Sequence, residues 1–422
     1  MTGRELQVRD RVMDRRRFLK VAGAGGAAVV LSSALGADWA AAAMGRRVYV
    51  LVVDGCRPDE IDETLTPRMY ALRAGGTHYP NARSLPVTET IPDHTMMMAG
   101  MRPDRTGVPA NSVYDRSEQA VRDLDRPSDL RAPTVLERLP SLGLTTASVL
   151  SKEYLHGIFG NRATYRWEPF PVVPVSGHAP DQLTMDAALA MLRDADPAMM
   201  FINLGDCDRV GHADITGTTL AAARSAALAC ADGQVGRFVD ELQSSGRWAE
   251  SVVVVLADHA MDWSYPDKVV CLTSVLDADP RLAGRVQAVQ NGGADLLYWT
   301  GPAAQRDQAV RRMRVLASGV EGVLSVHEPG ALRLGPEAGD LVAYCRAGWR
   351  FSEPQPVSNP IPGNHGHPAT EPIPFFVAGG SPLVASGVVS SRAVTTVDVA
   401  PTVGSVFGLP APDGGYDGIA LL

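Results

Sequence analysis

Residues 46 to 61 read RRVYVLVVDGCRPDEI, and the run from Val48 to Val53 decides the fold class. Every residue of this run is apolar and most are β-branched, which is the pattern of a strand buried on both faces. The run ends at Asp54-Gly55, so a carboxylate follows directly after a buried strand. In open α/β sheets, ligands bind outside the carboxyl ends of the strands. Asp54 is therefore a candidate site residue.

The same pattern returns along the chain. Further buried-strand runs are TTASVL at 145–150, AMMFINLG at 198–205, SVVVVLAD at 251–258 and IPFFVAGG at 373–380. Between them lie stretches with the helical spacing of apolar residues, at 182–195 and 218–246. Strands that alternate with helices predict an α/β fold with a mostly parallel central sheet.

Residues from about 265 to 360 follow a different pattern, with shorter apolar runs such as ADLLYWTG and GDLVAYCRAGWRF. We expect a small α+β insertion here, which interrupts a catalytic domain spanning 44–422 and shapes the access of substrate. The Pro-rich stretch at 352–374 is expected to be a loop.

The N-terminus carries the pattern of an export signal. Arg15 and Arg16 are followed by RFLK and by a mildly apolar run at 21–36, and three alanines at 41–43 offer a cleavage site. This resembles a twin-arginine signal peptide over residues 1–43. The run is short for a spanning helix of about 20 residues, although an uncleaved anchor stays open as the alternative. We therefore expect export by the twin-arginine machinery to the periplasm, cell envelope or exterior, with no membrane span after cleavage.

Composition indicates an ordinary folded protein of negative charge. Of 422 residues, 45% are hydrophobic and 20% charged, which allows a sizeable core. Without residues 1–43 the chain keeps 32 basic and 43 acidic residues, a formal charge of −11. That balance argues against binding of a nucleic-acid polymer, which needs a basic face. The five cysteines are odd in number and form no CxxC pair, so no disulfide framework is indicated.

Acidic and imidazole side chains recur close to the predicted strands. Asp208 and His212 follow the run at 198–205 in the spacing D-R-V-G-H, and Asp258-His259 closes the run at 251–258. His365 stands in GNHGH, shortly before the last strand. Carboxylates and imidazoles are the usual ligands of zinc and similar divalent ions, although such sites also accept manganese or iron.

A candidate hydroxyl stands in VTETIPDHTMMMAG, residues 87–100. The hydroxyl of Thr90 is a poor nucleophile alone, but coordination to a metal ion would lower its pKa. Two metal ions about 4 Å apart can clamp the attacking and leaving oxygens of a phosphoryl group. Pro92 and the MMMAG block predict a buried helix beginning here, and a helix N-terminus favours phosphate.

In this order the motifs resemble the alkaline phosphatase superfamily, and most closely its type I phosphodiesterase/nucleotide pyrophosphatase branch, which includes phosphonoacetate hydrolase. The family's T-x-T-F-P-N-H is similar to TETIPDH at 88–94, and its D-x-x-G-H to residues 208–212. Its D-H-G-M is similar to DHAM at 258–261, and its G-x-H-G to GNHG at 363–366. The resemblance continues through Asn111 and the stretch TTVDVAPTVGSVFGLP at 395–410, and thus covers nearly the whole mature chain.

The resemblance implies a three-layer α/β sandwich and a pair of bound metal ions, zinc being expected. One ion would be held by Asp208, His212 and His365. The other would be held by Asp54, Asp258 and His259, with the Thr90 oxygen beside it as nucleophile and metal ligand. Asn111 would donate to a phosphoryl oxygen.

Several residues remain open at this point. Lys152, in SVLSKEYLHGIFG at 148–160, resembles a lysine that meets the substrate carboxylate in the phosphonoacetate hydrolase branch. A second basic residue nearby is missing, so the favoured interpretation is a solvated lysine at a helix start. The family's Phe after the nucleophile is Ile91 here, which weakens the case for a stacked nucleobase. His94 is expected to pack near the helix start without binding a metal, and Cys207 to be a small buried side chain.

The implied activity is hydrolysis of a small-molecule phosphate ester through a phospho-threonine. A phosphodiesterase or nucleotide pyrophosphatase is favoured. A phosphomonoesterase or a phosphonoacetate-hydrolase-like C–P hydrolase is the alternative. A sulfatase of the same superfamily would need Cys or Ser in C/S-x-P-x-R, which TIPDH lacks. From another class, a metal-binding protein without turnover stays open.

Overall fold

The computed structural model describes residues 45–168, 177–213 and 221–422. The expected signal peptide, 1–43, lies outside the described residues. In the described part of the chain, no helix combines the length and the apolar character that a membrane crossing requires.

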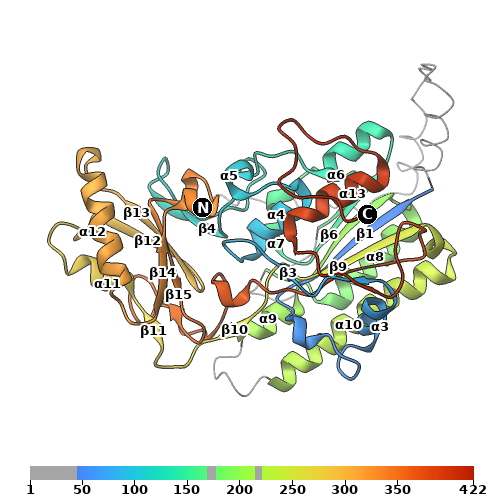
Figure 1. Cartoon of the computed structure of the whole chain (residues 1–422), viewed down its shortest axis with the longest axis horizontal. Coiled ribbons are helices and arrows are strands. Elements are labelled where there is room, and N and C mark those ends of the chain that lie inside the picture. Colours follow the sequence, from blue (N-terminus) through green and yellow to red (C-terminus); the bar gives the residue numbers. More distant parts are fainter. Residues whose placement is uncertain (1–44, 169–176, 214–220) are drawn as a thin grey trace, which may run out of the picture. The chain divides into compact units, whose positions relative to one another are not determined.

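An eight-stranded sheet forms the centre of the fold (Figure 1). Its strands, from one edge to the other, are β19 (Val388–Val389), β2 (Thr77–His78), β18 (Phe375–Ala378), β9 (Ser251–Leu256), β1 (Arg47–Val53), β8 (Met199–Leu204), β6 (Thr146–Leu150) and β7 (Tyr165–Trp167). From β9 to β7, each strand is parallel to the next one in the sheet. β18 is antiparallel to β9 and β2, so the sheet is mixed and mostly parallel.

Helices cover both faces of this sheet (Figure 1). One layer contains α4 (Thr90–Ala99), α5 (Pro103–Thr106), α6 (Val135–Arg138), α7 (Glu153–Phe159) and α13 (Val399–Phe407). The other contains α3 (Pro67–Gly75), α8 (Asp181–Ala195), α9 (Asp206–Ala213) and α10 (Ala221–Ser244). The predicted α/β class with a mostly parallel sheet between helices is therefore confirmed.

The sequence explains why β1 lies at the centre. Residues Val48 to Val53 are all buried, as are all residues of β8 and β9 on either side. A strand flanked by two strands and covered by helices on both faces has no exposed side, so each position takes an apolar side chain. The polar residues within these three strands are Arg47, Asn203 and Ser251, and each lies at or next to a strand end.

A second sheet lies in residues 286–345, with the strand order β12-β13-β15-β14. Its strands are β12 (Val286–Asn291), β13 (Ala294–Trp299), β15 (Leu341–Cys345) and β14 (Val323–His327), and all its pairings are antiparallel. The accompanying helices are α11 (Leu272–Asp277) and α12 (Arg306–Ser318). These elements fall within the range for which the sequence predicts an insertion, and the division into domains stays a prediction.

Successive side chains of β13, in the second sheet, belong alternately to two hydrophobic cores. Leu296 and Tyr298 belong to the main core, whereas Leu297 and Trp299 pack with the residues of α11 and α12. Since successive side chains of a strand point to opposite faces, β13 is buried on both faces.

Short two-stranded ladders complete the described structure. They are β10 (Asp262–Trp263) with β17 (Gly363–Asn364), β11 (Val269–Val270) with β16 (Arg350–Phe351), β20 (Val394–Thr395) with β3 (Ala82–Arg83), and β4 (Ser112–Asp115) with β5 (Ala120–Asp123). All five cysteines are free. The stretch 352–374 is mostly loop, as predicted, apart from β17 and a single 3₁₀ turn.

Candidate active site

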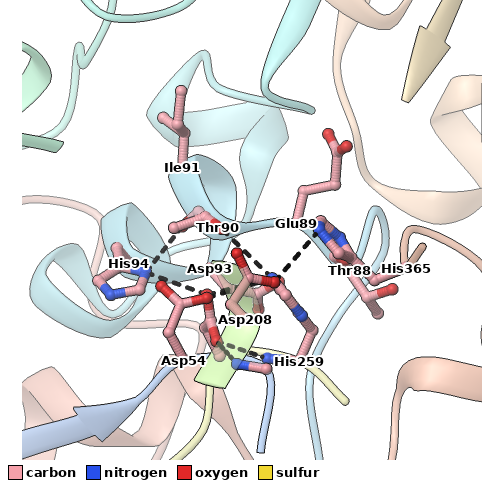
Figure 2. Close-up of polar contacts among 12 residues, drawn as sticks. Asp54, Thr88, Glu89, Thr90, Ile91, Asp93, His94, Asp208, His259 and His365 are labelled. Carbon is pink, nitrogen blue, oxygen red and sulfur yellow. Dashed lines mark hydrogen bonds and ion pairs between the residues drawn. The ribbon is translucent and has the colours of Figure 1, made fainter. Parts of the chain in front are cut away.

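Polar side chains gather at the carboxyl ends of neighbouring strands of the central sheet. β1, β6, β8 and β9 are followed by Asp54, Lys152, Asp208 and Asp258. Because these strands are parallel neighbours, their carboxyl ends meet at one edge. Figure 2 shows Asp54 and Asp208 near the start of α4, where Thr90 begins the helix.

One group that could hold a metal ion consists of Asp54, Asp258 and His259. The Nε2 atom of His259 lies 3.3 Å from Asp258 Oδ2 and 3.7 Å from Asp54 Oδ1. The other oxygen of Asp258 accepts the backbone N–H groups of Gly55 and His259, at 3.1 and 3.0 Å. These bonds fix the carboxylate so that Oδ2 faces the imidazole. The sequence assigned the same three residues to one ion.

The second group contains Asp208, His259 and His365, so His259 is shared between the two. His212, which the sequence assigned here, lies beside them. Its Nε2 atom is 3.0 Å from His365 Nε2 and 3.4 Å from Asp208 Oδ1. The structure therefore brings together all the predicted ligands, and it places His259 against both carboxylate clusters.

Backbone carbonyls orient the imidazoles of the second group. His212 Nδ1 lies 2.8 Å from the carbonyl oxygen of Gly363, and His365 Nδ1 lies 3.0 Å from that of Thr88. A carbonyl accepts a hydrogen bond, so Nδ1 carries a proton in each ring, and Nε2 is the nitrogen that can bind a metal ion once it is deprotonated. This is the arrangement by which a protein prepares histidine for a metal ion.

Thr90 stands between the two groups. It is 1% exposed, and its hydroxyl oxygen lies 3.3 Å from His259 Nε2 and 3.2 Å from Lys152 Nζ. As the first residue of α4, Thr90 lies at the positive end of the helix dipole. An anion bound beside the Thr90 hydroxyl would therefore lie at the positive end of the helix and next to both candidate metal-binding groups.

Lys152 is completely buried, so the favoured interpretation as a solvated helix-start lysine is wrong. Its position directly before α7 was predicted correctly, but its ammonium group turns inward. It lies 2.8 Å from Asp54 Oδ2 and 2.8 Å from Asp208 Oδ2. A buried ammonium is stable only when it is paired and hydrogen-bonded, and these carboxylates supply both conditions.

Three buried carboxylate oxygens are the main evidence that the site binds metal ions. Asp54 Oδ1, Asp208 Oδ1 and Asp258 Oδ2 have no hydrogen-bond partner in the described part of the chain. Buried charged oxygens without partners are costly unless a cation compensates them. All three face imidazole nitrogens across 3.3 to 3.9 Å. This donor set fits divalent ions of the zinc class.

Burial and mutual charge shift the pKa values of the site. Burial, together with the negative charge of Asp258, raises the pKa of Asp54 to about 6. Burial alone would also raise the pKa of Asp208, but the ammonium of Lys152 and the imidazole of His212 hold it well below its usual value. Burial lowers the pKa of His365 well below its usual value, and the neighbouring imidazoles add to this effect. A neutral imidazole is the form that binds a metal ion.

Comparison with known families decides the identity of this site. The family model described as "Type I phosphodiesterase / nucleotide pyrophosphatase" matches residues 48–367. The chain belongs to this family. The match spans both groups, Thr90 and the second sheet, and it confirms the resemblance that the sequence motifs indicated.

Solved structures with the same fold include two mammalian proteins and one bacterial enzyme. An inactive variant of murine ectonucleotide pyrophosphatase/phosphodiesterase 5 in complex with AMP is 16% identical, with a TM-score of 0.71 over 87% of this chain and 96% of that one. The human protein is 14% identical, with a TM-score of 0.70 over 88% and 97%. Phosphonoacetate hydrolase from Sinorhizobium meliloti, in complex with phosphonoformate, is 18% identical, with a TM-score of 0.67 over 86% and 96%.

As a member of this family, the chain is a phosphoester hydrolase. The hydrolase keeps its polar groups at the sheet edge where open α/β proteins bind ligands. The match to the family model shows that the chain belongs to the family. The similarity to the solved structures shows only that the fold is shared.

Residues around the hydrolase's Thr90 fix the start of α4. The side-chain oxygen of Asn111 accepts the backbone N–H of Ile91 at 2.8 Å, and the backbone N–H of Asn111 donates to Glu89 at 2.7 Å. Burial raises the pKa of Glu89 to about 8. Thr88 accepts the backbone N–H of Gly366 at 3.0 Å, which ties this segment to the loop that carries His365.

Ile91 and His94 are not among the ligand residues of the two groups, although His94 Nδ1 lies 3.5 Å from Asp258 Oδ2. The Ile91 side chain is 1% exposed and points away from the carboxylates (Figure 2), so residue 91 offers no stacking surface for a nucleobase. His94 is buried, and its Nδ1 atom lies 2.8 Å from the carbonyl oxygen of Thr90. Burial lowers the pKa of His94 to about 4. Cys207 is fully buried, as expected.

Two residues that sequence reasoning missed also belong to the site. Asn203, the last but one residue of β8, donates to Asp54 Oδ2 at 2.8 Å and lies 3.0 Å from His94 Nε2. A lone amide in the apolar run MMFINL was the available signal. Tyr154 interacts with the side chain of Thr90, and its ring centroid is 5.8 Å from Lys152 Nζ. No spacing or motif pointed to Tyr154.

Proposed function

We propose that this chain is an exported, two-metal phosphodiesterase or nucleotide pyrophosphatase that uses Thr90 as its nucleophile. The observation that carries the proposal is the position of the Thr90 hydroxyl, at a helix N-terminus and between two groups of buried carboxylates and imidazoles. Acids, imidazoles and a hydroxyl in this arrangement are suited to attack on phosphorus.

Each residue has a stated task in this proposal. Asp54, Asp258 and His259 would hold one ion beside the Thr90 oxygen, and Asp208, His212 and His365 would hold the other. The ions, zinc being the best fit to the ligand set, would supply charge neutralisation and a lower pKa for the hydroxyl.

The chain's own groups then act on the substrate. The Thr90 hydroxyl loses its proton, and its oxygen forms a bond to phosphorus as the bond from phosphorus to the leaving alcohol or phosphate breaks. Water then cleaves the bond between phosphorus and the Thr90 oxygen, which takes up a proton again. The product released is a phosphate monoester when the substrate is a diester, and free phosphate when it is a monoester. The Asn111 side-chain oxygen is bonded to Ile91, so its NH₂ group is the part that can donate to a phosphoryl oxygen. Preorganised donors of this kind stabilise the charge of a phosphoryl transition state.

A second candidate follows from the position of Lys152. Its buried ammonium lies 3.2 Å from the Thr90 oxygen, which would favour a substrate with an additional negative charge. Phosphate monoesters and carboxylate-bearing phosphonates are such substrates. Ile91 favours the same candidate indirectly, because residue 91 provides no aromatic surface for a base.

One experiment separates these candidates. Purified 44–422 is loaded with zinc and given bis-p-nitrophenyl phosphate, p-nitrophenyl phosphate and phosphonoacetate, each with Thr90→Ala and Thr90→Ser as variants. We expect the diester to be cleaved best, with at least about a 10³-fold loss in Thr90→Ala and a smaller loss in Thr90→Ser. Preference for the monoester or phosphonate would select the second candidate. Zinc binding without Thr90-dependent turnover on any of the three would favour a metal-binding protein.

Export is proposed from the sequence alone. Replacing both Arg15 and Arg16 by Lys should leave the protein in the cytoplasm, whereas the native chain should be found beyond the inner membrane. Cell fractionation with an antibody measures this, and equal distribution of the two proteins would contradict the proposal.

A further inference from the structure

Arg224 is a buried arginine that hydrogen-bonds to two segments of the chain. One segment contains the proposed ligand Asp54, and the other contains the proposed ligand Asp208. It lies in α10 and is 6% exposed. One guanidinium nitrogen donates to the carbonyl of Gly55 at 2.9 Å, and another donates to the carbonyl of Cys207 at 3.0 Å. Gly55 directly follows Asp54, and Cys207 directly precedes Asp208. A single side chain therefore joins the backbones beside the two carboxylates.

Glu60 holds this guanidinium in a fixed orientation. Its two carboxylate oxygens accept from Arg224 Nε at 2.6 Å and from Arg224 Nη2 at 2.7 Å. One of these oxygens also accepts the backbone N–H of Arg57 at 2.8 Å. A bidentate arginine–carboxylate pair restricts direction as well as distance. Arg224 thus cannot turn away from the two carbonyls without breaking a mostly buried ion pair.

Gly55 links the fixed guanidinium of Arg224 to the proposed ligands Asp258 and Asp208. Its N–H donates to Asp258 Oδ1 at 3.1 Å while its carbonyl accepts from Arg224. Its φ is +70°, and an added Cβ would lie 3.1 Å from the Cα and Oδ1 atoms of Asp208. The glycine is required by both the backbone conformation and the close approach. Any movement of this peptide would change the positions of Asp258 and Asp208.

Trp263 connects the cluster of Arg224, Glu60 and Gly55 to the backbone on either side of the His212 imidazole. Its ring centroid lies 5.1 Å from the guanidinium carbon of Arg224, and its indole N–H donates to the carbonyl of Gly211 at 3.3 Å. Gly211 directly precedes His212. Trp263 also pairs with Gly363, whose carbonyl lies 2.8 Å from His212 Nδ1. The contacts of this cluster therefore reach residues beside ligands of both groups.

We propose that Arg224, held by Glu60 and stacked on Trp263, is a positioning residue that sets the distance between the two metal groups. It touches no ligand atom and acts through the carbonyls of Gly55 and Cys207. The inference rests on the proposed function only in that the two groups bind metal ions. Outer-shell partners of metal ligands typically account for 10- to 100-fold in metal affinity.

The test is zinc binding by Arg224→Met, measured by competition with a chelating dye. Arg162→Met is the matched control, because Arg162 donates to the carbonyls of Ala132 and Leu130, at 3.2 and 2.6 Å, and pairs with Glu137. None of these partners adjoins a proposed ligand. Both variants should lower the melting temperature, but only Arg224→Met should lose about 10- to 100-fold in zinc affinity. Arg224→Lys should recover part of the loss.

Several results would overturn the inference. Unchanged zinc affinity in Arg224→Met, or an equal loss in Arg162→Met, would show that Arg224 only stabilises the fold. If circular dichroism finds Arg224→Met unfolded, Glu60→Gln keeps the side-chain size and should still weaken zinc binding by at least about threefold. Unchanged affinity in a folded Glu60→Gln would also contradict the role.

The same measurements separate this inference from the proposed function. A native chain that binds two zinc ions without cleaving any ester would remove the proposed function and leave the role of Arg224 intact. A native chain that cleaves esters, with a folded Arg224→Met of full zinc affinity, would remove the role of Arg224 alone. A native chain that binds no zinc would remove both.

Discussion

The ammonium nitrogen of Lys152 lies 3.2 Å from the hydroxyl oxygen of Thr90, in a position that no solvent reaches. The same nitrogen is 2.8 Å from a carboxylate oxygen of Asp54 and 2.8 Å from one of Asp208. Lys152 is therefore the counter-ion of one carboxylate from each group. Burial opposes its charge, but Asp208 and Asp54 hold its pKa well above the usual value.

We predict that Lys152→Met destabilises the metal-free protein more than the zinc-loaded protein. Without zinc, the substitution leaves two buried carboxylates without their cation, a loss of about 3–5 kcal/mol in the free energy of unfolding. Zinc would supply positive charge to the same carboxylates and reduce that loss. Melting temperatures in EDTA and in excess zinc measure the difference. Lys268→Met, at a partly exposed lysine near Trp349, is the control. An equal decrease under both conditions would contradict the prediction.

Asn111→Ala should reduce kcat by about 10²- to 10³-fold with little change in zinc affinity. The substitution removes one preorganised donor to the phosphoryl group and no proposed metal ligand. It also removes the bond to the N–H of Ile91, so melting temperature must be measured alongside. Steady-state kinetics on the best of the three ester substrates gives the result. Asn81→Ala, on the surface, is the neutral control. A loss confined to KM would assign Asn111 to ground-state binding instead.

His259→Ala should weaken both metal sites, whereas His212→Ala should weaken only one. His259 belongs to both groups of ligand atoms, and its Nε2 atom also lies 3.3 Å from the Thr90 oxygen. His212 contacts only Asp208 and His365 of the second group. Metal content after dialysis should therefore fall below one ion per chain in His259→Ala and stay near one in His212→Ala. The reverse order would require a new assignment of ligands.

Removal of metal from the native chain should abolish turnover and lower stability. At free zinc about 1,000 times the dissociation constant, binding adds about 4 kcal/mol to the free energy of unfolding. Dialysis against EDTA should therefore lower the melting temperature by several degrees, and zinc should restore both properties. Thr90→Ala retains the other ligands, so it should show most of the same stabilisation by zinc without turnover. Full activity after complete removal of metal would contradict the proposed mechanism.

The strands and the sheet edge could be predicted because they depend on local pattern. VYVLVV and SVVVVL are apolar at every position, and the acids that follow them mark the places where burial ends. Parallel topology then brings Asp54 and Asp258 together without any further information. The strand ends differed by one or two residues, since Gly379 and Gly380 follow β18 without joining it.

Burial of charged residues could not be predicted, because it depends on distant partners. Lys152 has the local sequence of a solvated helix start, and only Asp54 and Asp208, which lie elsewhere in the sequence, keep its ammonium inside. Arg224 stands in the Ala-rich run AAARSAALACA, where a single arginine normally faces water. Its carbonyl partners in two other segments are visible only in the folded chain.

The second sheet contains a buried acid that should make stability depend on pH. Asp295 in β13 has no exposed surface, and neither of its oxygens has a hydrogen-bond partner that could donate in the described part of the chain. It meets Glu353, whose carboxylate already accepts the backbone N–H of Thr273 at 3.0 Å. Two carboxylates cannot bond to each other unless one carries a proton. Burial, reinforced by the negative charge of Glu353, raises the pKa of Asp295 well above its usual value.

The sign of the effect follows from the raised pKa. The folded state keeps the proton of Asp295 at a pH where the unfolded chain, with a pKa near 4, has lost it. The stabilisation is fully present below about pH 4 and declines as pH rises towards the folded-state pKa, by up to about 1.4 kcal/mol per pH unit. Asp295→Asn can donate to Glu353 without a titrating proton, so its stability should fall less between pH 5 and 8. Urea unfolding of the metal-free proteins at four pH values measures the two slopes, with Asp267→Asn on the surface as control. Parallel slopes for the native chain and Asp295→Asn would show that Asp295 is ionised in the fold and that another group balances its charge.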